Sequence, residues 1–422
     1  MRLAASGRAC LSAAGSRAHW RRLRGAYCST AHASSKPNTQ LDNSSDPSDT
    51  LLRRTEFSQD RIGRDGNLIS GKLPAAPVLG PEDIPRPSFL PATAPLLPPI
   101  AVHQLQQLVD FVTGNRRLLV LTGAGCSTES AVPDYRGPQG AYNTGFKPMT
   151  HQQFMASEAA RRRYWARSFA GWHEFSGVRP NAAHEALARL QGRGWLTDLI
   201  TQNVDRLHHK AGSINVIELH GTTHRVVCMQ CGDLTDRQPF QEQLAALNPE
   251  AAAAVANMAR AGPDAEAARQ RSLRVGAGER DDKGGAFVRR PDGDVEVPVR
   301  RPDGDVELRD AGTNFVVPPC PRCGGILKPF VVFFGDGVPP DRSSRALELA
   351  EGCDGLLVVG SSLMVYSAFR LAKAAKAGGG ALAMLTAGPT RADAMADLKI
   401  EALAGEALSR LAAHPSLLIP RL

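Results

Sequence analysis

The 422-residue sequence lacks any long run of apolar residues. A membrane-spanning helix needs roughly 20 of them in succession, whereas the runs within 116–125 and 355–363 are short and end in glycine or serine. A transmembrane segment is therefore disfavoured, and both runs are typical of buried strands. Aromatic residues are scarce at 5%, but an apolar fraction of 42% is enough for one or two large domains with buried cores.

Acidic residues are absent from the first 41 residues. The same stretch is rich in Ala and Ser and carries seven basic residues: Arg2, Arg8, Arg17, Arg21, Arg22, Arg24 and Lys36. This composition is typical of a mitochondrial or plastid transit peptide, although a basic tail that stays attached has the same composition. The net charge of +8 resides mostly here, so the remaining chain is nearly neutral and nucleic-acid binding is disfavoured. We expect cleavage of 1–41 and a mitochondrial matrix location, with the plastid as the alternative.

Four of the eight cysteines form two Cys-x-x-Cys pairs, Cys228/Cys231 and Cys320/Cys323. In a large chain that is not secreted, such pairs indicate metal rather than disulfides. Four thiolates complete a tetrahedral structural zinc site, which leaves no coordination position for the nearby histidine His220.

The pattern of elements predicts an α/β fold, with a Rossmann-like parallel sheet and helices on both faces. Short β-branched strands, including 330–336, 355–363 and 381–388, alternate with helical stretches and end in small or polar residues. Ligands bind at the carboxyl ends of such strands. We predict a Pro/Ser-rich linker over 42–100 and a catalytic domain over 101–422. Within that domain, the Rossmann-like parts are 101–220 and 330–422, and a zinc module spans 221–329.

The segment 250–312 differs from its surroundings and is predicted to be a surface insertion. An Ala-rich helical run comes first, and the octapeptide RRPDGDVE then occurs twice, at 289–296 and 300–307. Pro-Asp-Gly-Asp favours turns, and two copies are too few for a solenoid.

The glycine turn TGAGCST at 122–128 follows a predicted strand, as a phosphate-binding loop does. The dinucleotide fingerprint of dehydrogenases is broken, because Thr128 stands at its third glycine position and no acidic residue follows about twenty positions later. A hydride-transfer enzyme is therefore disfavoured, and the turn by itself is equally consistent with a structural role.

Taken with the segments that follow it, the turn resembles the sirtuin family of NAD-dependent protein deacylases. The matching stretches occur in the family's order: LTGAGCSTESAVPDYRG, TQNVDRLHHKAG, ELHGTTHRVVC, both cysteine pairs, VVFFGD and VVGSSLMVY. YWARSFAGW and GPTRAD make the chain most similar to class II mitochondrial sirtuins with lipoamidase and deacylase activity. Cys126, however, replaces the isoleucine usual beside the phosphate loop.

The resemblance implies NAD as cosubstrate beside one structural zinc. It assigns NAD contacts to the glycine turn (Gly123, Ala124, Gly125, Ser127), a mobile cofactor loop (Asp134, Tyr135, Arg136), the nicotinamide-ribose end (Gln202, Asn203, Asp205) and the adenosine side (Gly360, Ser361, Ser362, Thr386, Gly388, Ala404). Segments 333–336 and 361–366 would clamp an acyl-lysine substrate as an added strand.

In the family, the histidine of the His-Gly motif is the catalytic base, which assigns that role to His220, with Asn203 and Asp205 as its catalytic partners. The acyl carbonyl oxygen attacks the ribose carbon that bears nicotinamide, and His220 then takes a proton from a ribose hydroxyl. A neutral imidazole with a pKa near 6.5 suits this step. The products are free lysine, nicotinamide and acyl-ADP-ribose.

Tyr164 and Arg167 form a Tyr-x-x-Arg pair that shares one helix face. In class II sirtuins such a pair engages acyl groups with an acidic tail, and the candidates here are glutaryl-type, lipoyl and biotinyl groups. The alternative is a solvated helix face, since Arg161–Arg163 stand alongside. Two other functions also remain open, protein mono-ADP-ribosyltransfer and NAD binding by a zinc-containing regulator with little turnover. The oligomeric state is not predicted.

Overall fold

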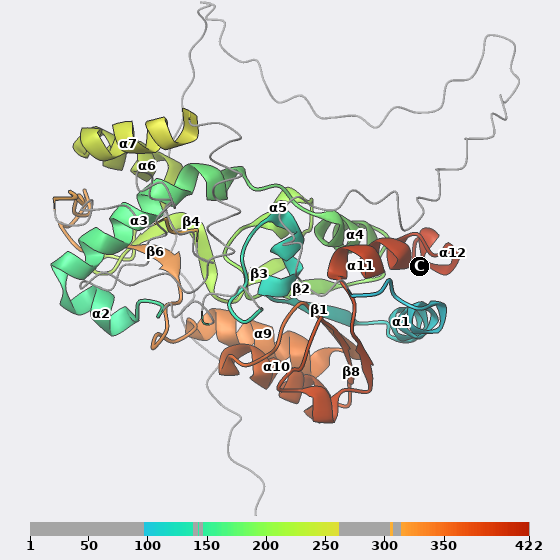
Figure 1. The fold of residues 1–422 in the computed structure, drawn as a ribbon. Coiled ribbons are helices and arrows are strands. Elements are labelled where there is room, and N and C mark those ends of the chain that lie inside the picture. The colour runs from blue at the N-terminus through green and yellow to red at the C-terminus, as the bar shows by residue number, and fades with distance from the viewer. Residues whose placement is uncertain (1–96, 138–141, 143–146, 261–303, 307–313, 422) are drawn as a thin grey trace, which may run out of the picture. The chain divides into compact units, whose positions relative to one another are not determined.

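A six-stranded parallel sheet forms the centre of the fold in this computed structural model, which describes residues 97–137, 142, 147–260, 304–306 and 314–421 (Figure 1). Its strands run in the order β3-β2-β1-β7-β8-β9, and all neighbouring pairs are parallel. Their bounds are β1 Leu118–Thr122, β2 Asp198–Thr201, β3 Val216–Glu218, β7 Gly355–Val359, β8 Ala381–Leu385 and β9 Leu398–Ile400. The predicted doubly wound parallel sheet is confirmed.

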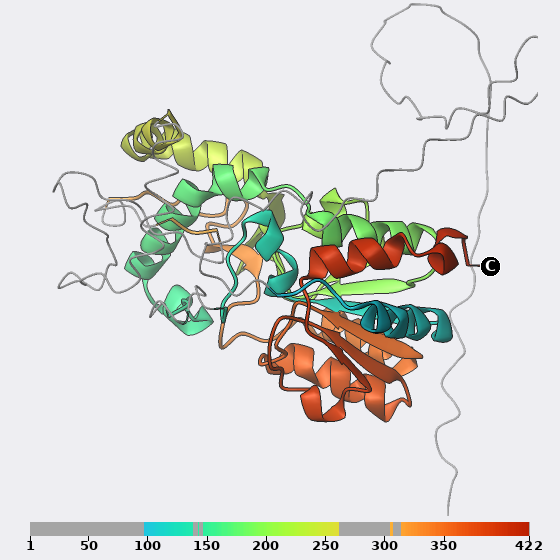
Figure 2. The ribbon, with the colours of Figure 1, turned by 45° about the vertical axis from the view of Figure 1, so that its right-hand side comes forward.

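Side chains of the central strands alternate between two buried cores, as the period of two in a strand requires. Leu118 and Val120 pack with α1 (Val102–Gly114), α4 (Ala182–Gly192), α11 (Ala404–Ala412) and α12 (Pro415–Leu418). Leu119 and Leu121 face the other core, with α9 (Pro340–Gly352) and α10 (Tyr366–Ala377). Figure 2 shows α4 and α11 on one side of the sheet, and α9 and α10 on the other. Because both faces are covered, these strands are apolar throughout.

A second layer contains a three-stranded antiparallel sheet in the order β5-β4-β6. Its strands are β4 Gly221–Cys228, β5 Leu234–Asp236 and β6 Leu327–Val331, and its helices are α2 His151–Ala156, α3 Glu158–Gly177, α6 Arg237–Leu247 and α7 Pro249–Arg260. A separate apolar core joins them, with Phe154, Trp165, Val226 and Phe240 at its centre. The Trp165 indole N–H donates to the Leu327 carbonyl at 3.1 Å, so α3 is fixed to this sheet.

The segment 330–336, predicted as a strand of the parallel sheet, was misplaced. The strand ends at Val331 and pairs antiparallel with β4, and the residues after it form the loop beside the cavity. Cys228 lies opposite Leu327 in this pairing, so the register brings the two Cys-x-x-Cys turns together. Apolar composition does not distinguish the strands of the two sheets. This strand was therefore predicted in the parallel sheet, although it belongs to the antiparallel one.

Parts of the predicted linker and of the predicted surface insertion are buried. Ile100, at the end of the predicted linker, is 3% exposed and packs in the first core. Within the predicted surface insertion, α7 is helical as expected, but Asp305 and Val306 of the second repeat are buried. The Val306 N–H donates to the Arg167 carbonyl on α3 at 3.1 Å. The first repeat and residues 1–41 lie outside the described residues.

Short helical segments complete the described chain. They are η1 Ala124–Cys126 and η2 Thr128–Ser130 after β1, α5 Leu207–Lys210 after β2, and η3 Asp393–Met395 before β9. Among the described residues, no helix is both long and apolar enough to traverse a lipid bilayer.

Candidate active site and zinc centre

The strand order places the candidate site at the centre of the sheet. β1 and β7 are neighbours, and the chain continues outward from them in opposite directions, which is the switch point where α/β sheets bind ligands. The loops that follow these strands lie in direct backbone contact, with the Gly125 N–H donating to the Gly360 carbonyl at 2.8 Å. A side chain at Gly360, whose φ is +60°, would overlap the Cys126 amide. Glycine is therefore required where the two loops meet.

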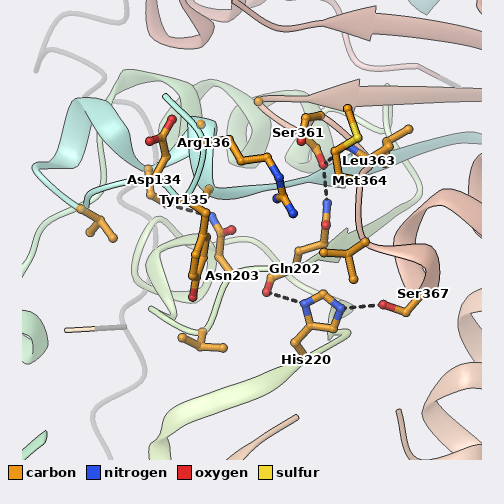
Figure 3. Close-up of a pocket in the computed structure, with 18 of the residues that line it drawn as sticks. Asp134, Tyr135, Arg136, Gln202, Asn203, His220, Ser361, Leu363, Met364 and Ser367 are labelled. Atoms are coloured by element: carbon orange, nitrogen blue, oxygen red, sulfur yellow. Dashed lines mark hydrogen bonds between the residues drawn. The ribbon is translucent and has the colours of Figure 1, made fainter. Parts of the chain in front are cut away.

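A cavity of about 970 Å³ opens at this point (Figure 3). Every residue nominated for NAD contact lines it except Gly123, whose carbonyl instead accepts a hydrogen bond from Asn203 Nδ2 at 3.1 Å. The lining residues of that set are Ala124, Gly125, Ser127, Asp134, Tyr135, Arg136, Gln202, Asn203, Asp205, Gly360, Ser361, Ser362, Thr386, Gly388 and Ala404. A cradle of glycine backbone beside amide and carboxylate side chains fits a dinucleotide, whose phosphates need close backbone approach.

A buried hydrogen-bond network ties the loop after β1 to the loop after β2. Asn203 Nδ2 donates to Ser127 Oγ at 2.9 Å, and Ser127 Oγ donates to Asp205 Oδ2 at 2.7 Å. The other carboxylate oxygen accepts from the Leu207 N–H at 2.9 Å. Asp205 is 4% exposed, and burial raises its pKa while these donors oppose that rise. The network fixes the orientation of the Asn203 and Ser127 side chains at the cavity wall.

Gln202 connects the same loop to β7. Its Nε2 donates to Ser361 Oγ at 2.7 Å and to the Thr122 carbonyl at 3.2 Å. The carboxyl ends of β1, β2 and β7 are thus held together by side-chain hydrogen bonds, and Figure 3 shows Gln202 between Ser361 and His220.

His220 lies between β3 and β4, directly before Gly221, and both of its ring nitrogens have partners. Nδ1 is 3.1 Å from the Gln202 carbonyl, and Nε2 is 2.8 Å from Ser367 Oγ (Figure 3). A carbonyl can only accept, so Nδ1 carries the proton and Nε2 presents its lone pair. Burial lowers the pKa of His220 to about 4, so the predicted value near 6.5 was wrong. The imidazole is neutral at physiological pH.

The cofactor-loop residues Asp134, Tyr135 and Arg136 follow β1 and face the same cavity (Figure 3). Asp134 Oδ1 accepts from the Gly137 N–H at 2.9 Å, which closes a turn, and burial raises its pKa. The Arg136 guanidinium lies 5.0 Å from the centre of the Tyr142 ring.

The structure separates the two residues nominated for acyl recognition. Tyr164 lines the cavity and packs edge-on against Phe154. Arg167, one turn later on α3, does not line it. Its Nε lies 3.5 Å from Oδ2 of Asp305, whose side chain is 1% exposed. The Arg167 side chain is 15% exposed, so it does not belong to a solvated helix face. Its role in binding an acyl group stays a prediction.

The four paired cysteines converge as the sequence predicts. Their sulfurs all lie within 4.8 Å of one another, with Cys228 and Cys323 3.5 Å apart and Cys231 and Cys320 3.8 Å apart. Amide donation from Cys231 is the largest influence on Cys228 and lowers the pKa of its thiol to about 6. Four converging thiols fit a tetrahedral structural zinc. None of them lines the cavity, so a metal here would hold β4 and β6 together without touching a ligand in the cavity.

A Sir2 family profile matches residues 123–367, more than half of the chain. The chain belongs to the Sir2 family. This sirtuin is 44% identical over 346 residues to the NAD-dependent protein deacylase SRT2 of Arabidopsis thaliana, which covers 82% of this chain and 86% of the relative.

Two further comparisons agree with this membership. The sirtuin is 41% identical over 316 residues to the NAD-dependent protein lipoamidase sirtuin-4, mitochondrial, of Bos taurus, which covers 74% of this chain and 87% of the relative. A solved structure described as Sir2-p53 peptide-NAD+ superposes with a TM-score of 0.51 at 25% identity, over 73% of this chain and 96% of that one.

The sequence pattern does not indicate the roles of two residues, Ser367 and Asp305, whose contacts depend on the fold. Ser367 is an ordinary serine in the first turn of α10, and only the fold brings it to His220 Nε2. Asp305 belongs to a repeat with turn composition, and nothing in its neighbours indicates that it packs on α3.

Replacing Cys320 with Ser tests the zinc assignment. A hydroxyl is a poor zinc ligand, and structural metal sites contribute directly to folding. We expect the variant to bind about one zinc fewer per chain than the wild-type protein and to unfold at a lower temperature, as measured by elemental analysis and thermal unfolding. Cys353→Ser is the matched control, because Cys353 is buried but unpaired with other cysteines. Full zinc content and normal stability in Cys320→Ser would contradict the assignment.

Proposed function

We propose that this sirtuin is an NAD-dependent protein deacylase that transfers the acyl group of a modified lysine to ADP-ribose and releases nicotinamide. The observation that carries the proposal is the placement of His220 Nε2, an unprotonated nitrogen in the same cavity as Asn203 and Asp205. The names of the relatives support the same reaction class.

We propose that NAD lies along the cavity. The glycine turn and Ser127 would hold the phosphates and neighbouring ribose, and Gly360, Ser361, Ser362, Thr386, Gly388 and Ala404 would hold the adenosine side. Gln202, Asn203 and Asp205 would hold the nicotinamide ribose and carboxamide. NAD supplies the electrophilic ribose carbon, and the protein supplies orientation and a base.

The base is His220. Its Nδ1–H donates to the Gln202 carbonyl, which fixes the ring and leaves Nε2 to accept a proton from a ribose hydroxyl. Ser367 occupies that lone pair at 2.8 Å in this structure, and we propose that the ribose hydroxyl takes its place. The substrate backbone would lie between the loop 332–336 and Leu363–Val365, which face the same cavity.

Replacing His220 with Gln should abolish deacylation while sparing the earlier step. Nicotinamide departure precedes the proton transfer to His220, so exchange of labelled nicotinamide into NAD should persist while free lysine formation falls by at least about 100-fold, in line with the loss of a general base. Zinc content should stay at the wild-type level.

The wild-type pH profile provides a second measurement of His220. Only the neutral imidazole accepts a proton, and its pKa is lowered to about 4. The contribution of His220 to kcat/KM should therefore persist as pH falls through 6.5 to about 5.

For the His220→Gln variant, a folded protein that loses both lysine formation and nicotinamide exchange would show that His220 binds the cosubstrate rather than acting as a base.

For the acyl group we propose an acid-tailed or lipoyl-type chain that reaches Tyr164 and Arg167. Tyr164 lines the cavity, and Arg167, three residues later on α3, lies beyond the cavity lining beside Asp305. Asp305 already provides Arg167 with a carboxylate, so an acidic acyl group must take its place. The insertion would therefore influence the choice of acyl group.

Arg167→Met removes the charge and keeps the length of the stem. It should lower kcat/KM on glutaryl-lysine peptides by about 10- to 150-fold, the equivalent of roughly 1.5–3 kcal/mol for a hydrogen bond to a charged group, and leave acetyl-lysine unchanged or improved. Asp305→Ala is the matched variant and should raise activity on the acidic acyl group. Equal losses on both peptides in Arg167→Met would mean that Arg167 only holds the insertion on α3.

We also propose that residues 1–41 direct the sirtuin to mitochondria. The absence of acidic residues in this basic stretch supports it, and the similar bovine lipoamidase sirtuin-4 is named as a mitochondrial protein. A fluorescent reporter fused to 1–41 should enter mitochondria, and substituting Arg21, Arg22 and Arg24 with Gln should impair import. Plastid uptake in plant cells would select the alternative, and a cytosolic reporter would reject the leader altogether.

A further inference from the structure

A second group of metal-binding side chains lies beneath the glycine turn. Cys126, His184 and His208 each offer one ligand atom, and the three atoms lie within 4.8 Å of one another. Cys126 and His184 are 0% exposed and His208 is 1% exposed. The cluster contains none of the four paired cysteines, and it comes from three elements: η1, α4 and α5.

The hydrogen bonds of His208 leave a lone pair without a partner. Its Nε2 lies 2.9 Å from Thr122 Oγ1, and that hydroxyl already donates its proton to Thr201. Nε2 must therefore be the donor, and Nδ1 is unprotonated. This nitrogen is buried and has no hydrogen-bond partner among the described residues. A buried lone pair without a donor carries a desolvation cost.

His184 differs in that its Nε2 has one polar neighbour, Ser127 Oγ. Its Nδ1 lies 2.9 Å from Asn181 Oδ1 and 3.3 Å from the Asn181 amide nitrogen, and the shorter contact, to an oxygen that can only accept, favours the proton on Nδ1. Ser127 Oγ lies 3.4 Å from Nε2 but donates its proton to Asp205. Burial lowers the pKa of His184 to about 4, so the ring stays neutral. The thiol of Cys126 has a single proton and cannot satisfy both imidazoles.

We propose that Cys126, His184 and His208 form a second metal site that takes a zinc-class divalent cation. Thiolate and neutral imidazole are the ligands that zinc prefers. Each imidazole already donates its other N–H to an oxygen, the arrangement that orients histidine ligands. Tetrahedral zinc places its ligand atoms roughly 3.5 Å apart. The three atoms here lie within 4.8 Å of one another, so binding an ion moves them closer by at most about 1.3 Å. The Cys126 thiolate and the adjacent Asp205 carboxylate balance the charge of the ion.

Metal at this site would act on the cavity through Ser127. Ser127 lines the cavity, lies next to Cys126 in the chain and bonds both Asn203 and Asp205. Closing the cluster onto an ion would shift this residue, so we expect the metal to inhibit turnover of NAD. This second consequence depends on the proposed deacylase function, whereas metal binding does not.

Zinc stoichiometry of the full-length protein tests the site. Protein expressed in zinc-supplemented medium should retain two zinc ions per chain after desalting, and Cys126→Ala should retain one. Cys353→Ala is the matched control, because its thiol is also buried but donates to the Ala350 carbonyl, away from any histidine; it should retain two. Since the cluster is closed to solvent, loading during synthesis avoids slow entry.

The number of zinc ions per wild-type chain tests the proposal even if Cys126→Ala does not fold. One zinc per wild-type chain, or two in folded Cys126→Ala, would overturn the second site. For the effect on turnover, wild type and Cys353→Ala loaded with zinc during expression should turn over NAD at least about 10-fold more slowly than Cys126→Ala prepared in the same way. Two zinc ions per wild-type chain without this difference in turnover would support the second metal site and reject its proposed effect on the cavity.

Discussion

The buried carboxylate of Asp205 is the group on which the geometry of the cavity depends. It accepts hydrogen bonds from Ser127 and Leu207, and Ser127 in turn accepts from Asn203. A carboxylate that is 4% exposed is destabilised unless such donors surround it. The hydrogen bonds that Asp205 requires therefore fix the loops after β1 and β2. Removing one of the donors would leave a buried charge or polar group without a partner.

The rest of the site is built outward from this point. Gln202, three residues before Asp205, bonds Ser361 through its side chain and His220 through its carbonyl. One four-residue loop therefore positions the phosphate turn, the β7 loop and the proposed base together. The four paired cysteines do not line the cavity, and their sulfurs converge where β4 pairs with β6. A zinc ion bound there would fix β6, and the loop that follows β6 lines the cavity.

The sequence was informative wherever the signal was local. Apolar runs bounded by glycine predicted β1, β7 and β8, and the Cys-x-x-Cys pairs predicted four converging sulfurs. It failed where two distant segments had to be paired. The register of β6 against β4, the burial of Asp305 on α3 and the contact of Ser367 with His220 all depend on tertiary packing. The lowered pKa of His220 has the same origin, because burial is a property of the fold and not of the residue.

The central claim is that this cavity transfers an acyl group to ADP-ribose, and the product formed by the wild-type protein tests it most directly. Mass spectrometry of a reaction with NAD and an acyl-lysine peptide distinguishes the three functions that the sequence left open. Deacylation in this cavity should yield acyl-ADP-ribose, nicotinamide and unmodified lysine in equal amounts. ADP-ribose attached to protein, or NAD bound without turnover across acetyl, glutaryl, lipoyl and biotinyl peptides, would contradict it.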